Sequence, residues 1–151
     1  MTPDIRRATH DDLEDLVPLF DGYRRFYAQP ADMPRAREFL ADRLQRAESA
    51  IFLARIDGAA VGFTQLYPMF SSVRTARVWV LNDLFVDAVA RGCGVARALL
   101  SAAAEFARAD GAIRLELETT PDNAQAQALY RATGWHLYDE TLRFHLPLSN
   151  G

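Results

Sequence analysis

The stretch Leu81–Leu100 reads LNDLFVDAVARGCGVARALL and decides the fold of this chain. From Val78 to Val86 the residues are mainly Val, Trp, Leu and Phe, which favour a pleated strand. From Val95 onward the residues are mainly Ala, Arg and Leu, which are strong helix formers. Between them, Arg91-Gly92-Cys93-Gly94 contains two glycines that can adopt backbone angles closed to other residues. The stretch therefore predicts a strand that turns sharply into a helix.

This glycine turn predicts a binding site for a pyrophosphate. The first N–H groups of a helix have no intrahelical partner, and the helix dipole adds partial positive charge there. Arg91 adds a full positive charge and a planar donor fork suited to phosphate. The spacing is neither that of a P-loop nor the GxGxxG of a dinucleotide fold, because the position five after Gly92 is Arg97. A turn that uses its glycines only to reverse the chain is the alternative.

Length and charge narrow the class of protein. The chain has 151 residues, which is about one ordinary domain and enough to bury a real core. Half of the residues are hydrophobic and a quarter are charged, as is typical of a globular protein. The formal net charge of −3 argues against nonspecific nucleic-acid binding, which is driven by basic surface. It agrees with a cationic substrate.

Metal and membrane sites have no support in the sequence. The single cysteine, Cys93, excludes an intrachain disulfide and any CxxC metal pattern. His10, His136 and His145 are far apart and lack ligand spacing, so we expect no metal. No apolar run approaches the roughly 20 residues of a membrane span, and no basic start precedes an apolar run. We expect a cytoplasmic protein without membrane association.

The rest of the chain predicts one α/β domain over residues 1–151. Asp57-Gly58 between two β-rich runs is a strong hairpin signal. Pro68 and Ser71-Ser72 indicate a further turn, and Pro18 suggests a kink or an interruption in the first helix. The predicted strands are Asp4–Ala8, Ala50–Ile56, Ala59–Tyr67, Ala76–Val86, Ala112–Glu118, His136–Tyr138 and Leu142–Leu148. The predicted helices cover residues 10–27, Pro34–Ala47, Val95–Asp110 and Asn123–Ala132.

The run NAQAQALY from Asn123 to Tyr130 is the second informative motif, and it is followed by Gly134-Trp135. Ala126, Leu129 and Tyr130 fall on one helical face. The small Ala126 allows the close approach of a ligand or a neighbouring strand, and Tyr130 projects a phenol from the same side. A core tyrosine with a satisfied hydroxyl is the alternative.

Together the two motifs resemble the GNAT superfamily of N-acetyltransferases. Its R-x-x-G-x-G/A signature is matched by Arg91, Gly94 and Ala96, after the strand pattern Leu84-Phe85-Val86. Its N-x-x-A-x-x-L-Y-x-x-x-G-F/W pattern is matched by Asn123, Ala126, Leu129, Tyr130, Gly134 and Trp135. The resemblance covers essentially the full chain. It implies a single domain with a mixed, mostly antiparallel central sheet of six to seven strands flanked by about four helices.

The resemblance also implies a place for acetyl-CoA. Backbone groups of Leu84–Val86 would pair with the pantetheine arm like an added strand, where family members splay neighbouring strands. Amides from Gly92 to Ala96 would hold the pyrophosphate, and Cys93 would contribute its amide rather than a nucleophilic thiol. Tyr130 would protonate the leaving thiolate. The implied cofactor-binding residues are Leu84, Phe85, Val86, Arg91, Gly92, Cys93, Gly94, Val95, Ala96, Asn123 and Ala126.

A general base is needed because alkylammonium pKa values lie near 10 and only the neutral amine attacks the thioester. Asp83 is the leading candidate, at the strand end beside the expected thioester. The run Asn82–Val86 is similar to polyamine acetyltransferases, which carry an acidic pair there, but Asn82 replaces the first acid. Glu116, Glu118 or a chain of waters are the alternatives.

The acceptor is predicted from side chains expected near the cleft. Tyr23, Tyr27 and Glu118 are the substrate-binding candidates, although core packing is an alternative for the tyrosines. We expect acetyl transfer to a primary amine of a small cationic molecule in a ternary complex. Acetylation of a protein N-terminus or lysine, and a non-catalytic CoA sensor, are the alternatives. The resemblance also implies a homodimer, because closing strands pair between subunits in this family.

Overall fold

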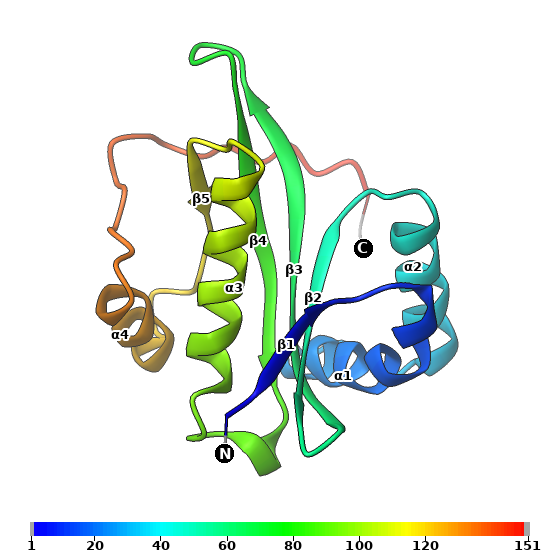
Figure 1. The fold of residues 1–151 in the computed structure, drawn as a ribbon. Helices are drawn as coiled ribbons and strands as arrows, with labels where there is room; N and C mark the ends of the chain where they lie inside the picture. Colours follow the sequence, from blue (N-terminus) through cyan, green and yellow to red (C-terminus); the bar gives the residue numbers. More distant parts are fainter. Residues whose placement is uncertain (1, 150–151) are drawn as a thin grey trace. The chain divides into compact units, whose positions relative to one another are not determined.

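The computed structural model describes residues 2–149, so Met1, Asn150 and Gly151 of the predicted domain lie outside the described residues. The chain divides into two compact units between Glu118 and Thr119. A five-stranded sheet in the order β1-β2-β3-β4-β5 organises the first unit (Figure 1). Its strands are β1 (Asp4–Arg7), β2 (Ala50–Ile56), β3 (Ala59–Ser71), β4 (Ala76–Val86) and β5 (Arg114–Glu116).

The first four strands of this sheet form an antiparallel meander. Strands β1 to β4 pair antiparallel in chain order, and β5 joins β4 in parallel. The Asp57-Gly58 hairpin is also confirmed, with both residues in the left-handed region at φ 50° and 82°. A parallel strand needs a crossover connection, and α3 (Val95–Ala109) supplies it between β4 and β5.

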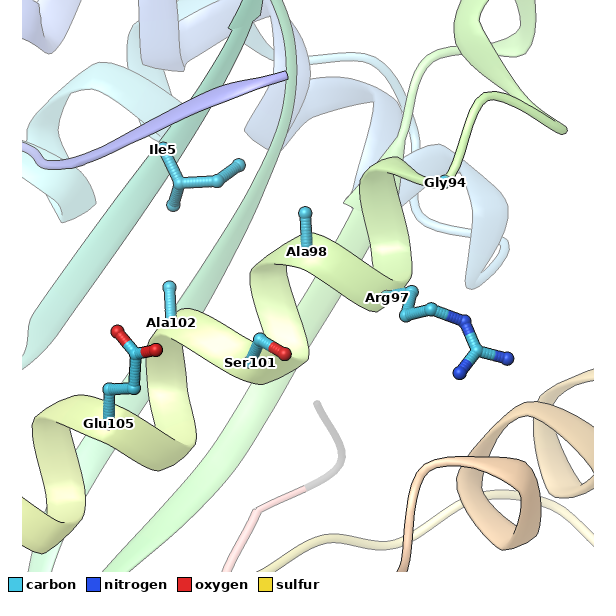
Figure 2. Close-up of a pocket in the computed structure, with 7 residues that line it drawn as sticks. All are labelled: Ile5, Gly94, Arg97, Ala98, Ser101, Ala102 and Glu105. Atoms are coloured by element: carbon cyan, nitrogen blue, oxygen red, sulfur yellow. The ribbon is translucent and has the colours of Figure 1, made fainter. Parts of the chain in front are cut away.

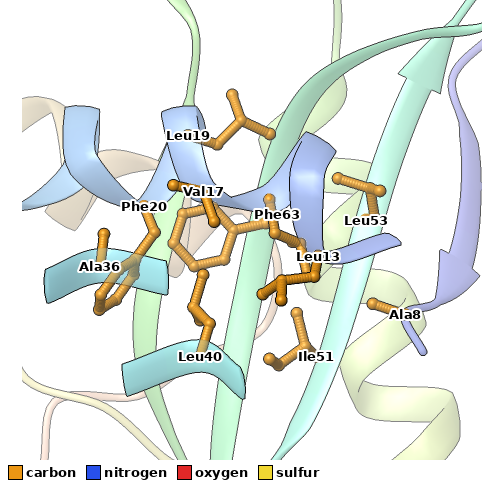
Figure 3. Packing of buried hydrophobic residues seen from close by; sticks show 11 residues of the cluster. Ala8, Leu13, Val17, Leu19, Phe20, Ala36, Leu40, Ile51, Leu53 and Phe63 are labelled. Atoms are coloured by element: carbon orange, nitrogen blue, oxygen red, sulfur yellow. The ribbon is translucent and has the colours of Figure 1, made fainter. Parts of the chain in front are cut away.

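Helices cover both faces of the sheet. Helices α1 (Leu13–Phe26) and α2 (Met33–Gln45) pack on one face, where Ile51, Leu53 and Phe63 of the strands meet Val17 and Leu40 (Figure 3). Helix α3 packs on the other face, where its Phe106 contacts Phe52 at a ring-centroid distance of 5.4 Å. The alternation of side chains along β2 therefore feeds two hydrophobic layers.

Pro68 does not end a strand, contrary to the prediction of a turn there. Strand β3 continues through Pro68, which lies opposite Trp79 of β4. The pairing of β3 with β2 ends at Leu66, so beyond that point β3 has a strand neighbour on one side only. The missing N–H of Pro68 is tolerated on an edge of this kind.

Pro18 does not interrupt the first helix. Helix α1 is continuous from Leu13 to Phe26 with Pro18 inside it. The lost backbone hydrogen bond is offset by burial, because Leu16, Val17, Leu19 and Phe20 around the proline are all buried. Two short 3₁₀ turns, His10–Asp12 and Ala88–Ala90, precede α1 and the glycine turn.

The second unit contains one helix, α4 (Ala124–Ala132), among its described residues. The side chain of Asn123 accepts a hydrogen bond from the Ala126 N–H at 3.2 Å and so caps the helix. Gly134 follows the helix at φ 95° and ends it, as its position predicts.

The closing strands were predicted wrongly, and the sheet has five strands rather than six to seven. The segments His136–Tyr138 and Leu142–Leu148 have no regular secondary structure. Alternation is present in Leu142–Leu148, but a strand also needs a hydrogen-bonding edge beside it. Pro147 also lacks the N–H that a ladder uses. The strand predicted at Ala112–Glu118 is likewise shorter, at Arg114–Glu116.

Candidate active site

A β-bulge shapes β4 at the middle of the candidate site. Gln65 lies opposite Asp83, but the next residue of β3, Leu66, lies opposite Leu81, so Asn82 is an extra residue on β4. A bulge bends a strand and re-aims its side chains. Asp83 and Gln65 share one face of the sheet beyond the bulge, and both are buried.

The Asp83 carboxylate is held by amide groups. The Gln65 side-chain nitrogen donates to Asp83 Oδ2 at 2.7 Å, and the Asn82 side-chain nitrogen donates to Oδ1 at 2.9 Å. The Thr64 hydroxyl donates to the backbone carbonyl of Asp83 at 2.7 Å. Ser49 donates to Gln65 Oε1 at 2.8 Å, which completes a buried chain from Ser49 to Asp83.

Burial raises the pKa of Asp83 to about 6, and hydrogen bonds from Asn82 and Gln65 oppose this rise. Desolvation penalises the charged carboxylate, whereas donors that point at its oxygens favour it. The carboxyl is 1% exposed and titrates close to neutral pH. A group of this kind can take up and release a proton under physiological conditions.

Three tyrosines, which we call the tyrosine cluster, accompany Asp83: Tyr23, Tyr27 and Tyr67. The Tyr23 hydroxyl donates to the backbone carbonyl of Asn82 at 3.0 Å, and the Tyr27 ring meets the Tyr23 ring edge-on at 5.1 Å. Burial first, and the charge of Asp83 second, raise the pKa of both Tyr23 and Tyr67 above the usual range. Both stay neutral phenols. Phenol rings beside a carboxylate favour a bound ammonium group.

The sequence did not identify Gln65, Ser49 or Tyr67 as members of this site. Gln65 and Tyr67 share a face of β3 with Phe63, which packs in the hydrophobic core. A polar residue on the same strand face as core residues can be recognised in the sequence as a candidate buried site. Its partner cannot, because that depends on the register between β3 and β4. Asp83, Tyr23 and Tyr27, which were predicted, do lie together in the structure.

The edge of β4 beyond the bulge has no strand beside it on the β5 side within residues 2–149. The parallel pairing of β4 with β5 covers only Val78–Val80 and Arg114–Glu116. The predicted pantetheine segment, Leu84–Val86, lies past this pairing and is half-buried. An extended ligand with amide groups can hydrogen-bond to such an edge.

The glycine turn has the backbone that its sequence predicts. Gly92 and Gly94 have φ values of 80° and 78°, in the left-handed region that favours glycine, and Gly94 precedes the first residue of α3. The N–H groups at the start of α3, from Val95 to Arg97, have no acceptor among residues 2–149. Arg91 Nε donates to the Val86 carbonyl at 3.2 Å and ties the turn to the end of β4.

Cys93 lies within this turn with its thiol exposed. Its backbone N–H donates to the Ala90 carbonyl at 3.4 Å, a long hydrogen bond. The thiol lies 3.9 Å from the Arg91 carbonyl. The neighbouring amides of α3 are therefore better placed than Cys93 to serve as anion donors.

An open groove of about 490 Å³ begins at the glycine turn (Figure 2). Gly94 lies at one end of it and Glu105 at the other, and Ile5 of β1 lines the side opposite α3. In Figure 2 the Arg97 guanidinium points away from Ile5, into solvent beside the first turn of α3. The groove adds a positively charged group close to the predicted pyrophosphate site.

A smaller recess of about 290 Å³ lies between α1 and α2. Its lining residues are Phe20, Arg24, Gln29, Arg35 and Phe39. The two arginines make this recess basic, whereas the Asp83 site is acidic. A cationic molecule would therefore be drawn to Asp83 and away from this recess.

Of the remaining predicted residues, Glu116 and Glu118 belong to the first unit, and Tyr130, Asn123 and Ala126 belong to the second. Glu118 is exposed at the end of the first unit, and Glu116 pairs with Arg114 at 2.8 Å, which occupies that carboxylate. Tyr130 belongs to the second unit, where its ring lies 6.0 Å from that of Trp135. Asn123 and Ala126 start the same helix, with the Asn123 side chain used as its cap.

Residues 2–149 contain neither a cluster of metal-binding side chains nor a membrane-spanning helix. No group of three or more His, Cys, Asp or Glu side chains within residues 2–149 could hold a metal ion. No helix in this part of the chain is both long enough and apolar enough to cross a bilayer.

Comparison with known proteins gives a consistent result. The model of the acetyltransferase (GNAT) family matches residues 13–135. The uncharacterised N-acetyltransferase YhfO of Bacillus subtilis is 46% identical over 131 residues, which cover 87% of this chain and 88% of that protein. An aminoglycoside N(6')-acetyltransferase type 1 of Stenotrophomonas maltophilia is 32% identical, with coverage of 97% and 94%. The crystal structure of a probable acetyltransferase superposes with a TM-score of 0.94 at 41% identity, covering 98% of this chain and 99% of that one.

Proposed function

This chain belongs to the GNAT family of acetyltransferases, and on that basis we propose that it acetylates a primary amine of a small cationic molecule. The donor that the family uses is acetyl-CoA. The amine attacks directly while donor and acceptor are both bound, and the two units of the chain act together as one catalytic domain.

The observation that carries this proposal is a buried carboxylate beside aromatic rings. Asp83 is 1% exposed, and its charge reaches the phenols of Tyr23 and Tyr67. An ammonium group gains from the carboxylate and from the ring faces, and the gain is larger in a site with little water. A neutral or anionic acceptor would leave the Asp83 charge without compensation.

The residues of the glycine turn and of the β4 edge fit the donor. The free N–H groups of Val95–Arg97 and the Arg91 side chain would hold the pyrophosphate, and Leu84–Val86 would pair with the pantetheine arm. Nothing lies within 4 Å of the position where a Cβ would stand on Gly94, so the backbone there can be approached closely. Acetyl-CoA supplies an acetyl group activated as a thioester.

Each step of the reaction can be given to a residue of the chain. Asp83 takes a proton from the bound ammonium group, so that the neutral amine can attack the thioester carbonyl and form the new N–C bond. The second proton of that nitrogen passes to solvent as the amide forms. Backbone N–H groups near Leu84–Val86 stabilise the negative charge that develops on the carbonyl oxygen. Tyr130 donates a proton to the sulfur as the C–S bond breaks, so that a neutral thiol leaves. Tyr23 and Tyr27 orient the acceptor, as does Glu118 at the end of the first unit.

A relative supports a cationic acceptor of low molecular mass. The protein of Stenotrophomonas maltophilia is named for an aminoglycoside, and aminoglycosides carry several amino groups. Polyamines remain in the proposed range, although Asn82 stands where the resemblance implies a second acid. In its Asp83 site this chain offers one buried carboxylate, which suits one ammonium group.

The proposal is tested by thiol release from acetyl-CoA with a panel of polyamines, amino acids, aminoglycosides and lysine peptides. With a responding amine, Asp83→Asn is expected to lower kcat/KM about 100-fold, because a positioned base contributes on that order. Asp11→Asn is the matched control, since Asp11 is exposed and its backbone N–H bonds the Thr9 hydroxyl, which is no part of the site. Wild-type turnover in Asp83→Asn would remove Asp83 from the mechanism. Donor binding without thiol release for any amine would favour a CoA sensor.

A further inference from the structure

Gln65 is a buried polar residue in contact with Asp83 that has no role in the proposed mechanism. It is 0% exposed on β3, directly opposite Asp83, and both ends of its amide are hydrogen-bonded. Its nitrogen lies 2.7 Å from Asp83 Oδ2, and its oxygen lies 2.8 Å from the Ser49 hydroxyl. A polar group at this depth is costly unless it is fully satisfied, and here it is.

The direction of these bonds depends on the charge of Asp83. An ionised carboxylate can only accept, so Gln65 must turn its NH₂ group toward Asp83 and its carbonyl toward Ser49. Ser49 then completes the network by donating to that carbonyl. If Gln65 turned over, its carbonyl would face the ionised carboxylate, and two acceptors would meet in a buried site. The arrangement therefore favours the ionised form of Asp83.

The two oxygens of Asp83 have different surroundings. Oδ2 is bound to Gln65 in the interior, whereas Oδ1 is bound to Asn82, whose side chain is exposed. An acceptor amine arriving from solvent can displace the Asn82 amide but not the Gln65 amide. Oδ1 is consequently the oxygen that is free to take a proton, and Oδ2 is the oxygen that fixes the carboxylate.

Other groups also face this carboxylate. Tyr23 of α1 and Tyr67 of β3 are the titratable side chains that interact with Asp83, and both are neutral near pH 7. The positive charge of Arg43 on α2 lowers the pKa of Tyr67, against the larger effect of burial. Asn82 and Gln65 are uncharged. Gln65 is therefore the buried donor that directly opposes the desolvation of Asp83.

We propose that Gln65, oriented by Ser49, is the positioning residue that holds Asp83 as a proton acceptor for the incoming amine. This proposal rests on the proposed function of Asp83 as the base. Gln65 does not touch substrate. It acts by fixing one carboxylate oxygen and by favouring the ionised carboxylate in a buried site.

The test compares Gln65→Met, Ser49→Ala and Thr64→Val by two readouts. The first is the pH dependence of kcat/KM, and the second is the titration of the Asp83 carboxyl carbon by ¹³C NMR. Loss of a donor to a charged group moves a pKa by about one to two units, so Gln65→Met should move the acid limb that far to higher pH. Activity should then recover to within about twofold of wild type on the alkaline side, which a purely structural defect would not do.

Ser49→Ala should move the acid limb in the same direction by a smaller amount, because Gln65 keeps its bond to Asp83 but loses its orientation. If Gln65→Met does not fold, Ser49→Ala still tests whether the orientation of Gln65 sets the pKa of Asp83. Thr64→Val is the matched control. Thr64 is equally buried on the same strand, but its hydroxyl bonds the Asp83 backbone and not the carboxylate. It should lower stability without moving the limb.

A Gln65→Met protein that is folded and titrates Asp83 at the wild-type pH, with an unmoved acid limb, would overturn the proposal. An NMR titration that moves while the rate profile stays fixed would instead show that Asp83 is not the base. The two measurements therefore distinguish a wrong role for Gln65 from a wrong role for Asp83.

Discussion

At the scale of single residues, the site depends on one carboxylate and the groups that surround it. Burial and hydrogen bonding act on Asp83 in opposite directions, and burial is the larger effect, so its pKa rises to about 6. Ionisation in the folded protein therefore costs free energy that ionisation in the unfolded chain does not. The same feature that makes Asp83 a suitable base makes it a source of instability above neutral pH.

The pH dependence of the unfolding free energy should reveal the cost of ionising Asp83 in the folded protein. An acid whose pKa is raised by folding stabilises the protein fully below its unfolded pKa of about 4, and that contribution is lost as the pH rises through about 6. Asp83→Asn cannot ionise. We expect the difference in unfolding free energy between the two proteins to change by about 2 kcal/mol from pH 4 to pH 7, in favour of the variant. Urea unfolding at several pH values measures it, and a constant difference would contradict the assigned pKa.

At the scale of elements, the turn from β4 into α3 joins two functions in one short segment. The strand provides an unpaired edge at Leu84–Val86, and the helix provides free N–H groups at its first turn. Arg91 links them by its bond to the Val86 carbonyl. The two halves of the proposed donor site are thus held by neighbouring parts of the chain.

Gly94 should be essential to donor binding for reasons of backbone geometry and access. Gly94→Val places a branched side chain at φ 78° and fills the open space before the helix. We expect a loss of affinity for acetyl-CoA of more than about tenfold by calorimetry. Gly111→Val is the matched control, because Gly111 follows the other end of α3 at φ 81° and also has open space around it. Equal losses of affinity in both variants would attribute the effect to strain alone.

At the scale of the whole molecule, local signals were predicted well, whereas the register between neighbouring strands was not. The run Leu81–Leu100 contains its own strand, turn and helix signals, so β4, the glycine turn and α3 were found where expected. Gln65 and Tyr67 were missed because they come close to Asp83 and Tyr23 only after β3 and β4 take their register. Ser49 was missed because it reaches Gln65 only through the pairing of β2 with β3. The bulge at Asn82 has no signature in the sequence of β4 alone.

The closing strands show the opposite error, in which a correct local pattern has no partner. Leu142, Phe144, Leu146 and Leu148 alternate with polar residues or proline, and their side chains are 82% to 91% exposed. Alternation predicts a strand, but pairing decides whether one forms. An apolar row of this kind is an obvious candidate to pair with another chain.

The resemblance implies a homodimer, and the apolar row at Leu142–Leu148 allows that expectation to be tested. Light scattering after size exclusion should give the mass of two 16.9 kDa chains. Phe144→Asp with Leu146→Asp should give one chain, because both charges fall on the apolar row. His145→Asp, on the other side of the alternation, should leave the mass unchanged. A monomeric wild-type protein would contradict the pairing.

Because of the bulge at Asn82, the odd-numbered residues of β4 lie on one face of the sheet before it and on the other face after it. Before it, Trp79 packs on Phe106 of α3, whereas after it Asp83 faces Gln65 and Phe85 packs against Gly22 of α1. One extra residue therefore places Trp79 and Asp83 on opposite faces of the sheet, although both positions are odd-numbered. In a regular strand of the same sequence, with no bulge, Asp83 would share the α3 face with Trp79. The side on which the carboxylate lies thus depends on one residue of β4 that has no counterpart on β3.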